Sequence, residues 1–256
     1  MTGQNHRLAD NLQPLQKPLR RISLFFQDQQ QRGRHLIACL RGKEVWARPT
    51  IRSNRMRLGA KDGEWCICPD GLHRGSIVYS FGVGKDISFD RALIDRFGVE
   101  IHAFDPTPIS AKWIRRQPAE SRFHFHPYGI AAYDGVAEFG LPLSHGVSFT
   151  LLPDVPSKRT ASGEVYRLAT ILQKLGHNRI DLLKLDIEGA EYEVIPQVIA
   201  AADRIEQLLI EFHHRLIPGG EGLERTRVAL GLLAENGFAL FNVSPRGLEY
   251  SFLRRR

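Results

Sequence analysis

Cysteine is scarce in this sequence, with only Cys39, Cys66 and Cys68 among 256 residues. Three is too small and odd a number for a disulfide framework, and the Cys66–Cys68 spacing is not the CxxC spacing of zinc ribbons. No apolar run approaches the roughly 20 residues that span a bilayer. The N-terminal stretch also lacks the apolar core of a secretory signal. We therefore expect a cytoplasmic protein without a transmembrane segment.

Acidic residues are outnumbered, and the imbalance is confined to one part of the chain. The formal net charge is +7, and residues 1–70 hold 13 Lys and Arg against 6 Asp and Glu. Residues 71–256 hold 22 of each kind. We therefore expect a basic N-terminal extension or small subdomain over residues 1–70 and a main domain over 71–256. The extension is either a solvated arm or a surface for an anionic partner, such as a lipid head group, a phosphorylated glycan or a nucleic acid.

From Ser76 onward, short apolar runs alternate with amphipathic stretches, a pattern typical of a parallel α/β sheet. It predicts a Rossmann-like α/β fold that ends in a hairpin. The expected strands are 77–81, 100–104, 122–126, 181–185 and 207–212, the helices are 86–97, 108–116, 166–175, 188–201 and 223–236, and the closing hairpin pairs 238–243 with 248–253. Residues 135–159 are expected to form a hairpin or an irregular insert.

A glycine turn follows the first strand of this pattern, in the segment Tyr-Ser-Phe-Gly-Val-Gly-Lys-Asp. Gly82 and Gly84 permit a tight turn and a close approach of the backbone to a ligand. Asp105 ends the next strand, 21 residues after Gly84, where a carboxylate can bind ribose hydroxyls. Its alternative role is to cap the helix after Pro106. The third glycine of a dinucleotide fingerprint is absent, which favours an adenosine-type cofactor other than NAD.

Carboxylates gather after the strand at 181–185. Asp186 follows this apolar strand directly, at the edge where α/β sheets bind ligands. It is therefore a candidate base or metal ligand. Glu188 and Glu191 come next, at the expected start of a helix, and either join that site or compensate the helix dipole.

A second polar pair ends the strand at 207–212. Strand alternation places Glu211 and His213 on one face, which can be the face that bears Asp186. His213 is a candidate base for a hydroxyl acceptor. Alternatively, Asp186, Glu211 and His213 hold a divalent metal such as Mg²⁺ that acidifies the acceptor, or His213 is a structural residue.

The stretch Asp-Leu-Leu-Lys-Leu-Asp-Ile-Glu-Gly-Ala-Glu-Tyr resembles the hallmark of FkbM-type methyltransferases. The glycine turn and His-Ala-Phe-Asp-Pro resemble the methyltransferase-like branch of that family. The likeness covers about residues 75–256 and implies a class I methyltransferase with a seven-stranded sheet and S-adenosylmethionine as donor. By this resemblance the cofactor-binding residues are Phe81, Gly82, Gly84, Asp105, Pro106, Tyr128 and Gly129. The first loop departs from the commoner Gly-Ala-Asn-x-Gly form.

The resemblance and the carboxylates together predict O-methylation of a sugar, a glycan, or a lipid-linked or natural-product hydroxyl. The catalytic candidates are Asp186, His213 and Glu188, because an alcohol must lose a proton when it is methylated. One alternative is an RNA methyltransferase that uses the basic N-terminal region. Another is a non-catalytic module that binds the cofactor.

Overall fold

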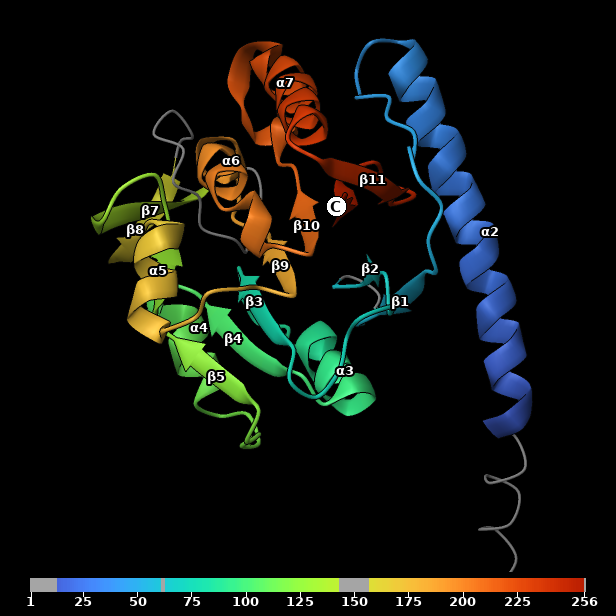
Figure 1. Ribbon diagram of the computed structural model, residues 1–256. Helices are drawn as coiled ribbons and strands as arrows, with labels where there is room; N and C mark the ends of the chain where they lie inside the picture. The colour runs from blue at the N-terminus through green and yellow to red at the C-terminus, as the bar shows by residue number, and fades with distance from the viewer. Residues whose placement is uncertain (1–12, 61–62, 143–156, 256) are drawn as a thin grey trace, which may run out of the picture. The chain divides into compact units, whose positions relative to one another are not determined.

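The computed structural model describes residues 13–60, 63–142 and 157–255, which fall into two units (Figure 1). The smaller unit comprises Met1–Trp46 and Pro245–Gly247, and the larger comprises Ala47–Ser244 and Leu248–Arg256. The expected boundary lay after residue 70. The segment from 47 to 70 instead belongs to the larger unit, because Trp65 and Ile67 are buried in its apolar core.

The smaller unit contains one long helix, α2, at Gln13–Leu40. The apolar run Ile22–Phe26 lies within it, and the sequence there carries no signal that fixes the length of a helix. Within the described part of the chain, no helix is long and apolar enough to cross a membrane.

The larger unit is built on a seven-stranded sheet of order β11-β12-β10-β9-β3-β4-β5. The strands are β3 (Ile77–Phe81), β4 (Glu100–Phe104), β5 (Phe123–His126), β9 (Leu182–Leu185), β10 (Gln207–Glu211), β11 (Phe238–Val243) and β12 (Glu249–Arg254). The strands from β10 to β5 run parallel, whereas β12 is antiparallel to both β10 and β11. The prediction of a mostly parallel, Rossmann-like sheet with a closing antiparallel hairpin is confirmed.

Two apolar clusters cover the two faces of this sheet, so the unit has three layers (Figure 1). The helices are α3 (Ser88–Phe97), α4 (Pro108–Ile114), α5 (Leu168–Leu175), α6 (Glu191–Ala200) and α7 (Glu221–Glu235). Residues of α5, α6 and α7 pack in one cluster, and residues of α3 and α4 pack in the other. In β9, Leu183 and Leu185 face the first cluster and Leu182 faces the second. Burial of both faces explains why β9 reads as an almost continuous apolar run.

Smaller elements complete the larger unit. Strands β1 (Met56–Leu58) and β2 (Trp65–Ile67) pair antiparallel. Strands β6 (Tyr128–Ile130), β7 (Gly135–Pro142) and β8 (Ser157–Tyr166) form a three-stranded sheet of order β6-β8-β7. Strands β7 and β8 are antiparallel, as expected of a hairpin over 135–159, although residues 143–156 lie outside the described ranges. Short 3-10 turns occupy Ala202–Arg204, His214–Leu216 and Pro218–Gly220.

The helix after β9 starts three residues later than the sequence indicated. The helix expected from Glu188 begins at Glu191. Glu188 has a φ of 53° and Gly189 a φ of 104°, so neither residue continues a right-handed helix. The intervening turn places Glu188 beside the cavity described next.

Candidate active site

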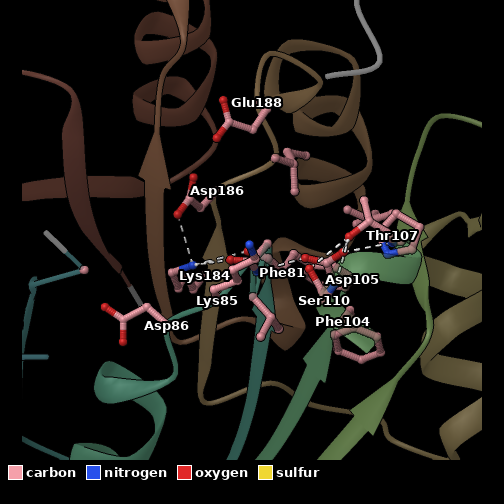
Figure 2. Close-up of a pocket in the computed structure, with 18 of the residues that line it drawn as sticks. Phe81, Lys85, Asp86, Phe104, Asp105, Thr107, Ser110, Lys184, Asp186 and Glu188 are labelled. Atoms are coloured by element: carbon pink, nitrogen blue, oxygen red, sulfur yellow. Dashed lines mark hydrogen bonds and ion pairs between the residues drawn. The ribbon is translucent and has the colours of Figure 1, made fainter. Parts of the chain in front are cut away.

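A cavity of ≈ 440 Å³ opens at the carboxyl ends of β3, β4 and β9. This is the edge at which open α/β sheets bind ligands. Among the labelled residues, Figure 2 shows two sets of polar side chains that lie apart from each other. Asp105, Thr107 and Ser110 lie on one side, whereas Asp186 and Glu188 lie on the other.

The turn between β3 and α3 forms part of the cavity wall. Gly82 has a φ of 82°, a conformation that a residue with a side chain rarely adopts. A Cβ at Gly82 would also collide with the carbonyl oxygen of Asp186. The backbone N–H of Gly82 donates to the carbonyl of Phe104 at 3.0 Å. The glycine is therefore required where the ends of three strands converge.

Asp105 is buried at the end of β4 and lines the cavity. Its Oδ2 accepts a hydrogen bond from the Gly84 N–H at 2.9 Å. Its Oδ1 accepts from the Thr107 N–H at 2.9 Å and from the Thr107 hydroxyl at 2.6 Å. Thr107, not Asp105, is the N-cap of α4. Asp105 therefore joins the glycine turn to the start of α4 and presents its carboxylate at the cavity wall.

Lys184 lines the same cavity, and the sequence reasoning did not identify it. Its side chain is 6% exposed, and its Nζ lies 5.2 Å from the Trp65 ring. The ammonium donates to the carbonyls of Phe81 and Gly82 at 3.3 and 3.2 Å, and to Asp186 Oδ2 at 3.3 Å. A lysine within a buried apolar strand was the available signal, because lysine is rarely buried without partners.

Asp186 and Glu188 project from the turn after β9 toward the cavity, and the dashed line in Figure 2 marks the ion pair of Asp186 with Lys184. Glu188 is the only described non-glycine residue with a positive φ. Such a conformation costs about 1–3 kcal/mol and often accompanies a functional site.

His213 lies beside this turn, with each ring nitrogen facing carboxylates. Its Nδ1 is 2.7 Å from Glu191 Oε1. Its Nε2 is 3.5 Å from Glu188, 3.8 Å from Asp186 and 4.0 Å from Glu211. Glu191 is completely buried and also accepts hydrogen bonds from the N–H groups of Ile187 and Gly189. Glu191 thus fixes both the turn and the orientation of the imidazole.

The charges around His213 decide its protonation. Burial by itself lowers the pKa of His213, but the carboxylates of Glu191, Glu188 and Glu211 outweigh burial and raise it well above its ordinary value. One ligand atom from each of Asp186, Glu211 and His213 lies within 4.8 Å of the others. The structure therefore brings together the three residues that the sequence grouped as metal ligands.

Most of the expected cofactor residues line the cavity, namely Phe81, Gly82, Gly84, Asp105, Pro106 and Gly129. Tyr128 is not among the lining residues, and its ring instead packs against Phe104 and Tyr166. The structure adds Asp90, Lys184, Thr107 and Ser110, which the sequence patterns did not single out. Binding of a cofactor by these residues stays a prediction.

Comparison with known proteins relates the chain to methyltransferases. The rat protein named "Probable methyltransferase-like protein 24" is 30% identical over 159 residues, which are 58% of this chain and 38% of that protein. The Streptomyces tacrolimicus protein named 31-O-demethyl-FK506 methyltransferase FkbM is 26% identical over 176 residues, covering 56% of this chain and 67% of that protein. The chain thus matches well under half the length of the rat relative.

Among solved structures, the Methanococcus jannaschii fibrillarin pre-rRNA processing protein aligns with a TM-score of 0.44 at 11% identity. The alignment covers 72% of this chain and 68% of that one. A family model described as a methyltransferase domain matches residues 47–246, nearly the whole larger unit and well over half of the chain. The chain therefore belongs to this methyltransferase domain family.

Proposed function

We propose that this chain transfers a methyl group from S-adenosylmethionine to a hydroxyl group of a sugar, a glycan, or a lipid-linked or other natural product. One observation carries the proposal. A single cavity joins the glycine turn and Asp105 on one side to the carboxylates of Asp186 and Glu188 on the other. Family membership supports methyl transfer, and the carboxylates favour an acceptor that must lose a proton.

The donor would bind on the Asp105 side. S-adenosylmethionine supplies an electrophilic methyl group together with an adenosine and an amino-acid end. Each carboxylate oxygen has two lone pairs. Oδ1 of Asp105 already accepts two hydrogen bonds and Oδ2 only one, so Oδ2 retains a position for a ribose hydroxyl. The buried, stacked rings of Phe81 and Phe104, with centroids 4.3 Å apart, support this side of the cavity. The glycine turn allows the close approach that this binding needs.

The acceptor would bind on the Asp186 side. A hydroxyl becomes a better nucleophile as a nearby base takes its proton. We assign this role to Asp186, which lines the cavity. Glu188 and His213 complete the catalytic group, with the imidazole held by Glu191. Because surrounding carboxylates raise the pKa of His213, we assign it the stabilisation of negative charge in place of the role of first proton acceptor.

A divalent metal gives the same residues a second possible role. Asp186, Glu211 and His213 offer two carboxylates and an imidazole, a donor set that suits a divalent cation. Binding would displace the imidazole proton, and the bound cation would acidify the acceptor hydroxyl. The bond from His213 to Glu191 would then orient a ligand.

Calorimetric titration with S-adenosylmethionine, S-adenosylhomocysteine and NAD, with and without Mg²⁺, tests the donor. We expect saturable binding of the first two and none of NAD. Binding of NAD alone contradicts the proposal.

An assay with methyl-labelled donor and a panel of sugars and lipid-linked glycans then tests the acceptor. Loss of turnover in EDTA supports the metal role.

The same assay separates the other interpretations. Labelling of RNA that weakens as salt rises indicates a nucleic-acid methyltransferase that uses the basic N-terminal region. Donor binding without labelling of any acceptor class indicates a binding module. Either result replaces the hydroxyl assignment and leaves the donor assignment in place.

A further inference from the structure

A buried carboxylate in the first turn of α3 has no role in the proposed function so far. Asp90 lines the cavity and is only 3% exposed. Among the described residues, neither its Oδ1 nor the buried Ser80 hydroxyl makes a hydrogen bond of good geometry, although the Ser80 hydroxyl lies close enough to lower the pKa of Asp90. An acceptor shut away from solvent without a donor costs about 1–3 kcal/mol. Folded proteins leave few such groups, and those that remain call for an explanation.

The neighbouring cation does not satisfy this carboxylate. Lys184 lines the same cavity, and its charge lowers the pKa of Asp90. An ammonium has three N–H donors, and Lys184 directs them to Phe81, Gly82 and Asp186. Burial nevertheless outweighs Lys184, the Ser80 hydroxyl and a backbone hydrogen bond, and it raises the pKa of Asp90. In the ligand-free protein, the negative charge of Asp90 is therefore buried without enough hydrogen-bond donors and positive charge around it.

We propose that Asp90 binds the α-ammonium group at the amino-acid end of the methyl donor. An ammonium brings both the hydrogen-bond donors and the positive charge that the carboxylate lacks. Asp90 and Asp105 line one cavity and follow Gly84 by 6 and 21 residues. They would hold the amino-acid and ribose ends of one ligand. This inference rests on the proposed function, since it requires a donor that carries an amino acid.

Two ligands that differ only at this end test the assignment. S-adenosylhomocysteine has the amino-acid end, whereas 5′-methylthioadenosine has the same adenosine and thioether without it. In Asp90→Asn we expect affinity for S-adenosylhomocysteine to fall by about 10- to 100-fold, the usual weight of a hydrogen bond to a charged group. Affinity for 5′-methylthioadenosine should change by less than about threefold, because that ligand has no ammonium.

Asp95→Asn is the matched control. Asp95 lies on the same helix and is exposed, so its substitution makes the same change of charge away from the cavity. Both ligands should bind this variant as they bind the wild type. Thermal unfolding of ligand-free Asp90→Asn should occur at the same or a higher temperature than in the wild type, since a buried acid that lacks partners has been removed.

Three results overturn the assignment. Unchanged affinity of Asp90→Asn for S-adenosylhomocysteine excludes contact with the ammonium. An equal loss for both ligands, with a lowered unfolding temperature, shows that Asp90 only supports the fold. Failure of wild-type protein to bind either ligand removes the proposed function, and this inference with it.

Discussion

The backbone N–H of Gly84 donates a hydrogen bond to Oδ2 of Asp105 at 2.9 Å, which joins the glycine turn to the end of the neighbouring strand. The same carboxylate holds Thr107 at the start of α4. We therefore expect Asp105→Ala to abolish donor binding and to lower the free energy of unfolding by about 1–3 kcal/mol. Calorimetry and urea denaturation measure the two effects. Undiminished donor affinity would remove Asp105 from the ribose site.

Asp186 should matter for turnover and not for donor binding. Its side chain lines the cavity on the side opposite Asp105 (Figure 2). We expect Asp186→Ala to bind S-adenosylhomocysteine within about threefold of the wild type and to lose at least about 100-fold in methyl transfer, the usual contribution of a positioned base. Single-turnover assays with labelled donor check this. A variant that stays active excludes Asp186 as the base.

Gly82 should tolerate no side chain. Alanine there must adopt a positive φ and would collide with the carbonyl of Asp186. We expect Gly82→Ala to lose donor binding and at least about 1–3 kcal/mol of stability. Gly231 in α7 is the control, because a Cβ there meets no atom within 4 Å. Gly231→Ala should stabilise the protein by about 0.5–1 kcal/mol. Equal behaviour of the two variants would contradict the close packing at Gly82.

A histidine cluster on the sheet should make stability depend on pH. The rings of His102 and His126 stack, with Nδ1 of the first 3.0 Å from Nε2 of the second. Burial, with neighbouring histidine charges, lowers the pKa of His102 from 6.5 to about 3 and that of His126 to about 4. Below about pH 6.5 these two histidines become protonated in the unfolded chain but stay neutral in the folded chain. The free energy of unfolding should therefore fall as pH falls from about 6.5 to about 4.

Urea midpoints at about pH 7.5 and about pH 5 measure this dependence. His102→Phe and His126→Phe each preserve an aromatic ring in the stacked pair and remove the titrating group. Each variant should therefore show a smaller drop in midpoint between the two pH values than the wild type. If both variants showed the same drop in midpoint as the wild type, the pH dependence of stability would have to come from other groups.

Strand and helix order could be predicted because the apolar pattern is local. Ile77–Phe81 and Glu100–Phe104 form strands over the expected residues. Asp105, Asp186 and His213 could be found as site candidates because they follow such strands. Asp90 and Lys184 were missed, since their placement depends on contacts with residues about a hundred positions away in sequence. Lys184 reaches Phe81, a pairing that requires β3 and β9 to be adjacent.

The turn at Glu188 illustrates a second limit. The dipeptide Glu-Gly reads as a helix start, because acidic residues favour that position. Glu188 instead adopts a left-handed conformation, and Glu191 binds the amides of the turn. Glu191 also binds His213, 22 residues further along the chain, a contact that the sequence does not reveal.

Gly82 lies between the Asp105 side and the Asp186 side of the cavity. Its N–H binds the β4 strand that ends in Asp105, its carbonyl accepts from Lys184, and its α-carbon abuts the backbone of Asp186. A shift of this turn by a fraction of an ångström would be transmitted to Asp186. We therefore expect substitutions at this crossing to change the donor Kd and the acceptor KM together.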